Sequence, residues 1–114
     1  MEENIESRIQ IQVQDENTAV IQIETDQPVD GKNADFIYIR LRNLQGGKMT
    51  VSWNNKKGDG GAVNCDCGDG CLLIPVGVNP SWLLSSHTRI DMRIEGCRKP
   101  EEITVEEVAY YHLK

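Results

Sequence analysis

The sequence predicts a single all-β domain, an antiparallel β-sandwich that spans residues 1–114. Apolar and polar residues alternate with a period of two in several segments, which is typical of strands with one buried face. Turn-forming Gly, Pro, Asn and Asp recur between these segments. Aromatic residues make up only 5% of the 114 residues, so the core must be thin and built from Ile, Val and Leu. Two stacked sheets suit such a core better than a helical bundle.

The first strands are predicted before residue 45. Apolar residues occupy every second position of residues 9–13 and return in the same pattern at residues 20–24. Residues 25–35 are rich in turn formers and predict a turn. Residues 36–44 form the clearest strand, with Ile and Leu on one face and Tyr and Arg on the other.

The middle of the chain alternates between strands and turns. We expect Gly46 and Gly47 to connect residues 36–44 in a hairpin to the next strand, whose apolar face carries Met49, Val51 and Trp53. This alternation places Trp53 in the core. Residues 55–70 hold few apolar side chains among many Gly, Asp and Asn, and they predict a loop.

The last third begins with a short apolar strand at residues 72–76. A turn at residues 79–81, with a short helical segment as an option, carries Trp82, which we expect to plug one end of the sandwich. Residues 88–95 form another alternating strand, and residues 103–113 form the closing strand. The adjacent Glu106 and Glu107 break its alternation, which predicts a β-bulge.

Charge and composition exclude several classes of function. The net charge is −6, and an acidic surface repels phosphate backbones, so we expect no nucleic-acid partner. No apolar run has the length needed to span a bilayer. Residues 1–10 have neither the basic nor the apolar region of a signal peptide. A module of a larger extracellular or cell-surface protein would have such a sequence.

Catalytic signatures are missing from the sequence. It contains no G-x-S-x-G motif, phosphate-binding loop or H-E-x-x-H motif. Neither His87 nor His112 has a nearby Ser or Cys in such a motif. As neighbours in a strand, Glu106 and Glu107 are expected to point to opposite faces, so they cannot act as a catalytic pair. We therefore expect a binding module and no enzyme.

The polar faces of three strands provide the candidate ligand-binding residues. If residues 36–44, 88–95 and 103–113 share one sheet, their polar side chains form a single face. Tyrosine rings stack on the apolar faces of sugars, and Arg donates forked hydrogen bonds to carboxylates and hydroxyls. Ion pairs that merely cover a solvent-facing sheet are the alternative. The candidate residues are Tyr38, Arg40, Arg42, Arg89, Asp91, Arg93, Tyr110 and His112.

Four cysteines, Cys65, Cys67, Cys71 and Cys97, suggest a structural staple. Four thiolates could hold a structural zinc ion, although C-x-C-x3-C with a distant fourth Cys is not a usual zinc pattern. Two disulfides are the equal alternative, and an antiparallel pairing would bring Cys71 and Cys97 together. Calcium is a third option, through the loop carboxylates Asp59, Asp66 and Asp69.

Three stretches resemble the jelly-roll domains related to galactose-binding and carbohydrate-binding modules. They are TDQPVDGKNADFIYIRLRNLQGGKMTVSWNN, CLLIPVGVNPSWLLSSHTRIDMRIEG and ITVEEVAYYHL. The resemblance covers roughly residues 20–114 and lies in core and turn positions. The cysteine-rich loop departs from the family, whose members carry a longer aromatic or polar loop there, so the sheet face is left as the candidate site.

The resemblance implies a jelly-roll topology and an accessory module that binds a polysaccharide. The arginine-rich face would favour an acidic polysaccharide such as a uronate polymer. A structural or protein-interaction domain of a larger multidomain protein is the alternative. That alternative predicts an exposed apolar strip and no affinity for glycans.

Overall fold

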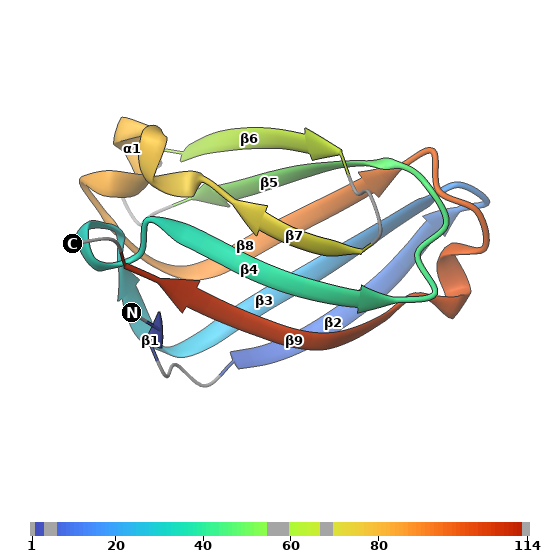
Figure 1. Ribbon diagram of the computed structural model, residues 1–114, viewed down its shortest axis with the longest axis horizontal. Coiled ribbons are helices and arrows are strands. Elements are labelled where there is room, and N and C mark those ends of the chain that lie inside the picture. The colour runs from blue at the N-terminus through green and yellow to red at the C-terminus, as the bar shows by residue number, and fades with distance from the viewer. Residues whose placement is uncertain (1, 4–6, 55–59, 67–69, 113–114) are drawn as a thin grey trace.

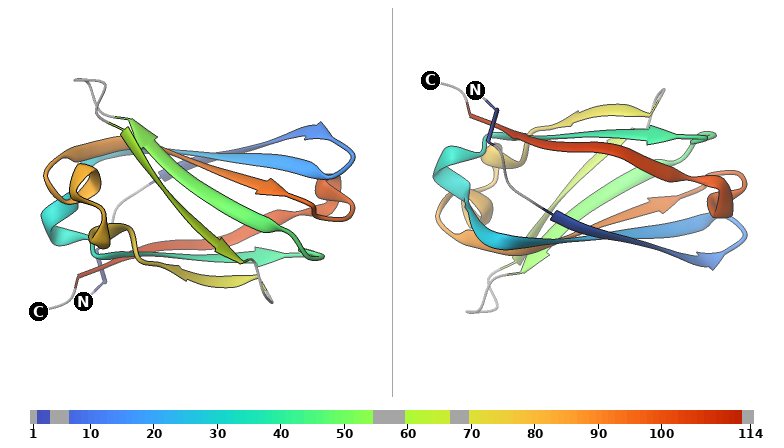
Figure 2. Two further views of the ribbon diagram at one scale, coloured as in Figure 1. Left: turned by 90° about the horizontal axis from the view of Figure 1, so that it is seen from above. Right: turned by 90° about the horizontal axis from the view of Figure 1, so that it is seen from below.

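A computed structural model describes residues 2–3, 7–54, 60–66 and 70–112 of the protein. These residues form two antiparallel sheets, which confirms the predicted all-β architecture. Sheet A has the strand order β1-β9-β4-β7, and sheet B has the order β2-β3-β8-β5-β6. The two sheets face each other as the layers of a sandwich (Figures 1 and 2).

The elements follow the chain closely. The strands are β1 (Glu2–Glu3), β2 (Ser7–Asp15), β3 (Thr18–Asp30), β4 (Phe36–Arg42), β5 (Lys48–Asn54), β6 (Gly60–Asp66), β7 (Cys71–Ile74), β8 (Ser86–Glu95) and β9 (Thr104–Tyr111). The helical segments are η1 (Gly31–Asn33), η2 (Val76–Val78), α1 (Pro80–Leu83) and η3 (Pro100–Glu102).

The core lies between the inner faces of the two sheets. In each central strand the apolar residues of the alternating pattern are the buried ones, as the period of two predicts. Trp53 is 3% exposed, which confirms its place in the core. The residues with no exposed surface include Ile21, Ile23, Ile37, Ile39, Met49, Val51, Ile74, Ile90, Met92 and Ile94.

The expected hairpin at Gly46 and Gly47 is wrong. β4 belongs to sheet A and β5 to sheet B, so the connection crosses from one layer to the other. Both glycines have positive φ, 77° and 106°, a conformation that side chains disfavour. At Gly47 a Cβ would also lie 3.0 Å from the Glu95 carbonyl oxygen. A Gly-Gly pair is therefore compatible with a tight connection between two sheets as well as with a hairpin within one sheet.

The expected loop at residues 55–70 contains strand β6, so that prediction is wrong for Gly60–Asp66. β6 pairs with β5 over its whole length. Its side chains alternate between exposed and half-buried positions, and Val63 and Cys65 pack against the core. Gly61 is required because a Cβ there would collide with the Ser81 hydroxyl. The glycine at this position therefore allows close packing of a strand and does not indicate a loop.

β3 continues to Asp30, through residues that were expected to form a turn. The register with β8 shifts between Glu24 and Val29, and Pro28 lies inside this interruption. A proline is tolerated there because no ladder hydrogen bond needs its missing N–H.

The predicted β-bulge in the last strand is confirmed. Arg40 lies opposite Glu107 and Leu41 lies opposite Val105, so Glu106 is the extra residue on β9. The strand ends at Tyr111, two residues before the expected end.

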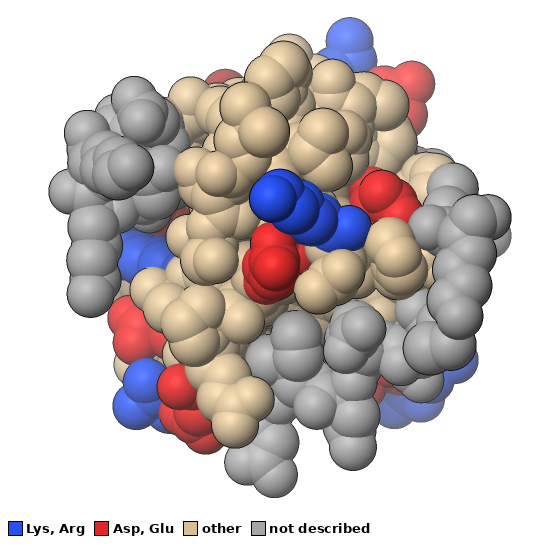
Figure 3. Space-filling model, turned by 90° about the vertical axis from the view of Figure 1, so that its left-hand side faces the viewer, with Lys and Arg blue, Asp and Glu red and all other residues tan. Residues whose placement is uncertain are grey.

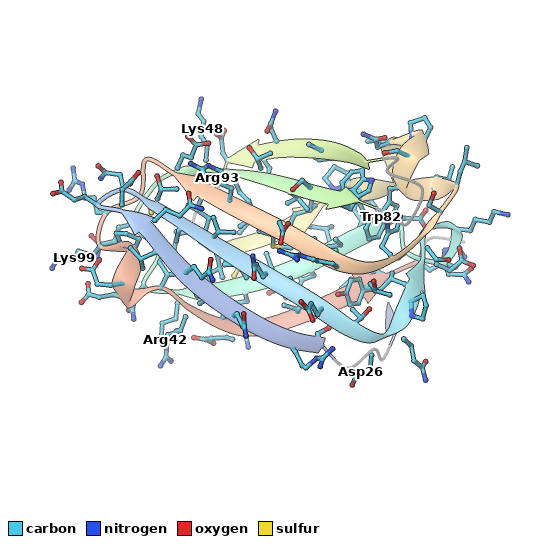
Figure 4. All side chains as sticks on the ribbon, turned by 180° about the vertical axis from the view of Figure 1, so that it is seen from behind. Asp26, Arg42, Lys48, Trp82, Arg93 and Lys99 are labelled. Atoms are coloured by element: carbon cyan, nitrogen blue, oxygen red, sulfur yellow. The ribbon has the colours of Figure 1, made fainter. Side chains whose placement is uncertain are left out.

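Trp82 closes one end of the sandwich, as the sequence predicts, and its ring is completely buried (Figure 4). Its Nε1 donates to the Ala34 carbonyl oxygen at 2.8 Å. Its ring stacks on His87 with centroids 4.1 Å apart and an interplanar angle of 5°. Trp53 meets it edge-on at 5.3 Å and donates its own Nε1–H to the Ser81 hydroxyl at 3.0 Å. These rings form the end plug, Trp53, Trp82 and His87.

His87 is held neutral within the end plug. Its Nε2 lies 2.9 Å from the Trp82 carbonyl oxygen, which can only accept, so Nε2 carries the proton. Its Nδ1 is buried and has no hydrogen-bond partner among the described residues. Desolvation lowers the pKa of His87, and the Trp82 hydrogen bond and Asp30 oppose this shift only in part.

The first prediction concerns the end plug. Trp82→Ala should lower the free energy of unfolding by about 3–5 kcal/mol, because it leaves a large cavity. Leu84→Ala is the matched control, since Leu84 is 72% exposed nearby, and it should change stability by less than about 0.5 kcal/mol. Urea denaturation measures both, and equal small losses would contradict the role of the plug.

The second prediction concerns pH. Because the folded-state pKa of His87 lies below its ordinary 6.5, the unfolded chain binds more protons once the pH falls below that value. The contribution of His87 to stability is therefore complete above the unfolded pKa and is lost as the pH falls toward the folded pKa. His87→Phe keeps a ring on Trp82 and cannot titrate. Between about pH 7.5 and about pH 5, wild type should lose more stability than His87→Phe in urea denaturation; equal losses would disprove this.

Candidate functional site

The expected single polar face is divided between the two sheets. β4 and β9 lie in sheet A, whereas β8 lies in sheet B. The sandwich therefore carries two opposite outer faces, and the core separates them. Tyr38, Arg40 and Arg42 lie on the outer face of sheet A, and Arg89, Asp91 and Arg93 lie on that of sheet B. The assumption that the three strands share a sheet was wrong.

Tyr110 was expected on the polar face, but it is completely buried. It lies opposite Ile37, whose side chain points into the core, so Tyr110 points the same way. The bulge at Glu106 is one residue long and reverses the facing of every later residue on β9. Burial raises the pKa of Tyr110, and the nearby Ser7 hydroxyl opposes this shift. Tyr111 is the tyrosine of β9 that faces outward.

His112 follows the end of β9 and does not share the face of Tyr38. Its Nδ1 lies 3.1 Å from Asp35 Oδ2. Asp35 precedes β4, and its backbone N–H donates to the Tyr111 carbonyl oxygen. His112 therefore fastens the end of β9 to the start of β4, away from the arginines.

One half of the outer face of sheet A is aromatic. The Tyr38 and Tyr111 rings meet edge to face with centroids 6.3 Å apart, and both residues are half-buried. Phe36 lies opposite Tyr111, and Leu73, which is 57% exposed, lies opposite Tyr38. A hydrogen bond with Cys71 and partial desolvation raise the pKa of Tyr38. We call Phe36, Tyr38, Leu73 and Tyr111 the aromatic patch.

The other half of this face is charged. Arg40 lies 3.4 Å from Glu106 and 3.5 Å from Glu107, measured from guanidinium nitrogen to carboxylate oxygen. Arg42 lies 2.8 Å from Glu106. The bulge places both glutamates on one arginine, so the expectation that Glu106 and Glu107 point to opposite faces was wrong. The aromatic patch and these four residues together form the candidate site.

The outer face of sheet B has a different character. Arg89 pairs with Asp91 at 3.3 Å, and Arg93 pairs with Glu95 at 3.3 Å. Arg93 also donates to the Gln14 side chain at 2.6 Å. Each of these arginines already has an acceptor on a neighbouring side chain. Among the described residues, no pair of aromatic rings lies on this outer face. These contacts match the alternative that ion pairs simply cover a solvent-facing sheet.

The structure describes three of the four cysteines and places them in three different parts of the fold, whereas Cys67 lies outside the described residues. Cys65 lies in β6 of sheet B and Cys71 in β7 of sheet A, while Cys97 is buried after β8. The pairing of Cys71 with Cys97 is wrong, because β7 and β8 lie in different sheets and Cys97 is a free thiol. Its Sγ donates to the Asn17 carbonyl oxygen at 3.3 Å. Desolvation raises the pKa of both Cys65 and Cys97, which keeps them in the protonated form.

The metal predictions find no support in the described part of the chain. No group of three or more His, Cys, Asp or Glu there could hold a metal ion. Cys67, Asp59 and Asp69 lie outside the described residues. Asp66 lies on β6 opposite Lys48. The zinc and calcium sites therefore stay predictions.

A concave surface opens at the edge of sheet B. This open hollow has a volume of about 950 Å³ and lies beside Lys48, Asn64, Cys65, Asp66 and Glu95. Lys48 lies between Asp66 and Glu95 in register, so its charge is balanced on both sides. None of the residues expected to bind sugar lines this hollow.

The chemistry of the candidate site combines ring faces with paired donors and acceptors. Aromatic rings bind apolar C–H surfaces, while guanidinium groups donate and carboxylates accept hydrogen bonds from hydroxyls. Sequence reasoning missed Phe36, Tyr111, Glu106 and Glu107. Counting the predicted bulge as one residue would have placed Tyr111 outward in place of Tyr110.

Comparisons with known proteins give no relative from which a role of the candidate site could be inferred. No protein-family model, curated protein or solved structure matches the chain. No helix in the part of the chain that the structure describes has the length and apolar character needed to cross a membrane.

The third prediction separates stability from binding at this site. Arg40 is 46% exposed, and water screens its ion pairs with Glu106 and Glu107. Arg40→Ala should therefore lower the free energy of unfolding by less than about 1 kcal/mol. Arg89→Ala, whose side chain is 52% exposed on the opposite sheet, is the matched control and should behave alike. A large loss for Arg40→Ala in urea denaturation would show that the cluster is structural.

Proposed function

We propose that the protein is a non-catalytic carbohydrate-binding module and that the outer face of sheet A is its binding surface. The observation that carries this proposal is the pair of half-buried tyrosine rings, Tyr38 and Tyr111, beside the Arg40 cluster. The rings of the end plug, by contrast, are buried in the core. The tyrosines of the aromatic patch keep part of their surface exposed, and exposed rings that are grouped beside polar residues are typical of a ligand-binding surface.

The charges of the site favour a neutral polysaccharide. Arg40 and Arg42 are matched by Glu106 and Glu107, so the face is balanced where the sequence suggested an excess of arginine. A uronate would have to compete with the glutamates for the guanidinium groups. Sugar hydroxyls can donate to a glutamate and accept from an arginine in the same contact. We therefore propose that hydroxyl-rich neutral chains bind, with acidic ones weaker.

We further propose that the sandwich is of the jelly-roll, galactose-binding-like type. Antiparallel pairing throughout and the long stretches that resemble that group of modules support this assignment. An accessory module at an extracellular or cell-surface location follows from the same resemblance. The ligand argument does not depend on it, since a fold hosts many functions.

The fourth prediction tests the site with two double variants that remove the same charge from opposite faces. Arg40→Ala with Arg42→Ala, and Tyr38→Ala by itself, should each weaken binding to a neutral polysaccharide about tenfold or more, equal to about 1.4 kcal/mol. Arg89→Ala with Arg93→Ala should leave binding unchanged. Affinity electrophoresis or calorimetry against neutral and acidic polysaccharides measures these effects.

Two outcomes would overturn this proposal. One is the absence of binding to any polysaccharide of the panel by the folded wild-type chain. The other is equal weakening by both double variants, because a nonspecific charge effect does not distinguish the two faces.

A protein-interaction domain is the second candidate, and exposed apolar side chains favour it. Val78 is 77% exposed and Leu84 is 72% exposed. Both belong to the end of the sandwich that carries α1, where much of the surface is uncharged (Figure 3). A module that binds a partner protein here would show no glycan affinity, and Val78→Ser with Leu84→Ser would abolish its partner binding while the sheet A variants would not.

A further inference from the structure

β2 forms one edge of sheet B and extends past the cover that sheet A provides. By register, Ile9, Ile11 and Val13 face the same side as Ile23, Ile21 and Ala19 of β3. The three β3 residues have no exposed surface. Ile9 is 38% exposed and Val13 is 48% exposed. An apolar row of the inner face therefore continues out of the core and into solvent at this edge.

The other sheet edges of the described chain are protected by familiar devices. β1 has only two residues, and β7 has four residues and runs into Pro75. β6 begins with glycine, and α1 packs against it, as the tight approach of Ser81 to Gly61 shows. Short strands, prolines and covering segments prevent an edge from pairing with another chain.

β2 is neither short, interrupted by proline nor covered by another segment of the described chain, and its one irregularity is a bulge between Val13 and Asp15. It has nine residues, SRIQIQVQD, without proline or lysine, and its register with β3 is regular from Ser7 to Val13. A long, regular edge of this kind presents unpaired backbone N–H and C=O groups to a further strand. The exposed apolar row beside it gives such a strand a surface to pack on.

We propose that β2 is an interface for a second copy of this chain, paired antiparallel about a two-fold axis at Ile11. In this register Ile9 faces Val13 of the second copy, and Gln10 faces its Gln12. Apolar side chains meet apolar ones and amides meet amides, so the strand is complementary to itself.

The alternating pattern sets which registers are allowed. A slip by one residue would place the apolar rows of the two copies on opposite faces of the joined sheet. The register centred on Ile11 pairs residues 9–13 of the two copies, which lie in the regular part of β2, and puts no two like charges directly opposite. The inner-face rows of both copies then lie side by side and cover each other's exposed edges.

The pairing has a defined size and geometry. Residues 9–13 of each copy form the regular pairing, and five residues at about 3.4 Å each make a contact about 17 Å long. A single strand edge is smaller than a permanent interface, so the dimer depends on protein concentration. The two-fold axis runs perpendicular to the sheets, so the outer faces of sheet A point the same way in both copies. The dimer itself does not rest on the proposed carbohydrate site.

The fifth prediction tests this interface by sedimentation velocity on the wild-type chain from micromolar to near-millimolar concentration. The mass should rise with concentration from 12.8 kDa toward twice that value. Ile11→Lys brings two ammonium groups together at the axis and should raise the dimer dissociation constant at least about tenfold. Val63→Lys is the matched control, because Val63 is half-buried on β6, the opposite edge of the same sheet.

A charge pair tests the register. Ile9→Lys should weaken the dimer, and adding Val13→Glu should restore it, because the new lysine faces the new glutamate of the second copy. The two positions lie about 14 Å apart within one strand, so they cannot form this pair within one chain. Thermal unfolding monitored by circular dichroism confirms that every variant is folded.

Three results would overturn the proposal. They are a 12.8 kDa species at every concentration, an Ile11→Lys variant that dimerises like wild type, and equal losses for Ile11→Lys and Val63→Lys. The first would leave the exposed row of β2 to a different partner or to none.

Discussion

The structure depends on one constraint, which is that the apolar row of every central strand must lie between the two sheets. With aromatic residues at 5% of the chain, this layer consists mainly of Ile, Val, Leu and Met. Because side chains alternate along a strand, burying one row forces the other row outward. The molecule therefore has two polar outer faces, one on each sheet, and they point in opposite directions.

The ends and edges of the layer need separate solutions. Trp82 and His87 stack at one end and close the gap between the sheets. The bulge at Glu106 shifts the facing of β9, so that Tyr110 fills the core and Tyr111 reaches the surface. The core thereby gains its largest rings, and sheet A gains an aromatic patch on its outer side.

Unequal sheets explain the contrast between the two faces and the exposed edge. Sheet B has five strands, whereas β1 of sheet A pairs with β9 at only two positions. Sheet A therefore covers β3 but not all of β2, and Ile9 and Val13 remain exposed. The outer face of sheet B is covered by ion pairs and amides, while that of sheet A combines rings with a balanced charge cluster. The proposed ligand site and the proposed dimer edge thus lie in different parts of the fold.

The sequence by itself determined which side of each strand is buried. Alternation correctly placed Trp53 in the core, and the adjacent Glu106 and Glu107 correctly predicted the bulge. Periodicity says nothing about which strands are neighbours, because the partner of a strand is chosen by contacts distant in sequence. Only the tertiary structure decided that Arg40 and Arg89 lie on opposite faces, that Cys71 and Cys97 are separated, and that a glycine-rich segment completes sheet B. A local pattern fixes the orientation of a side chain relative to its own strand, whereas a site requires the positions of several strands.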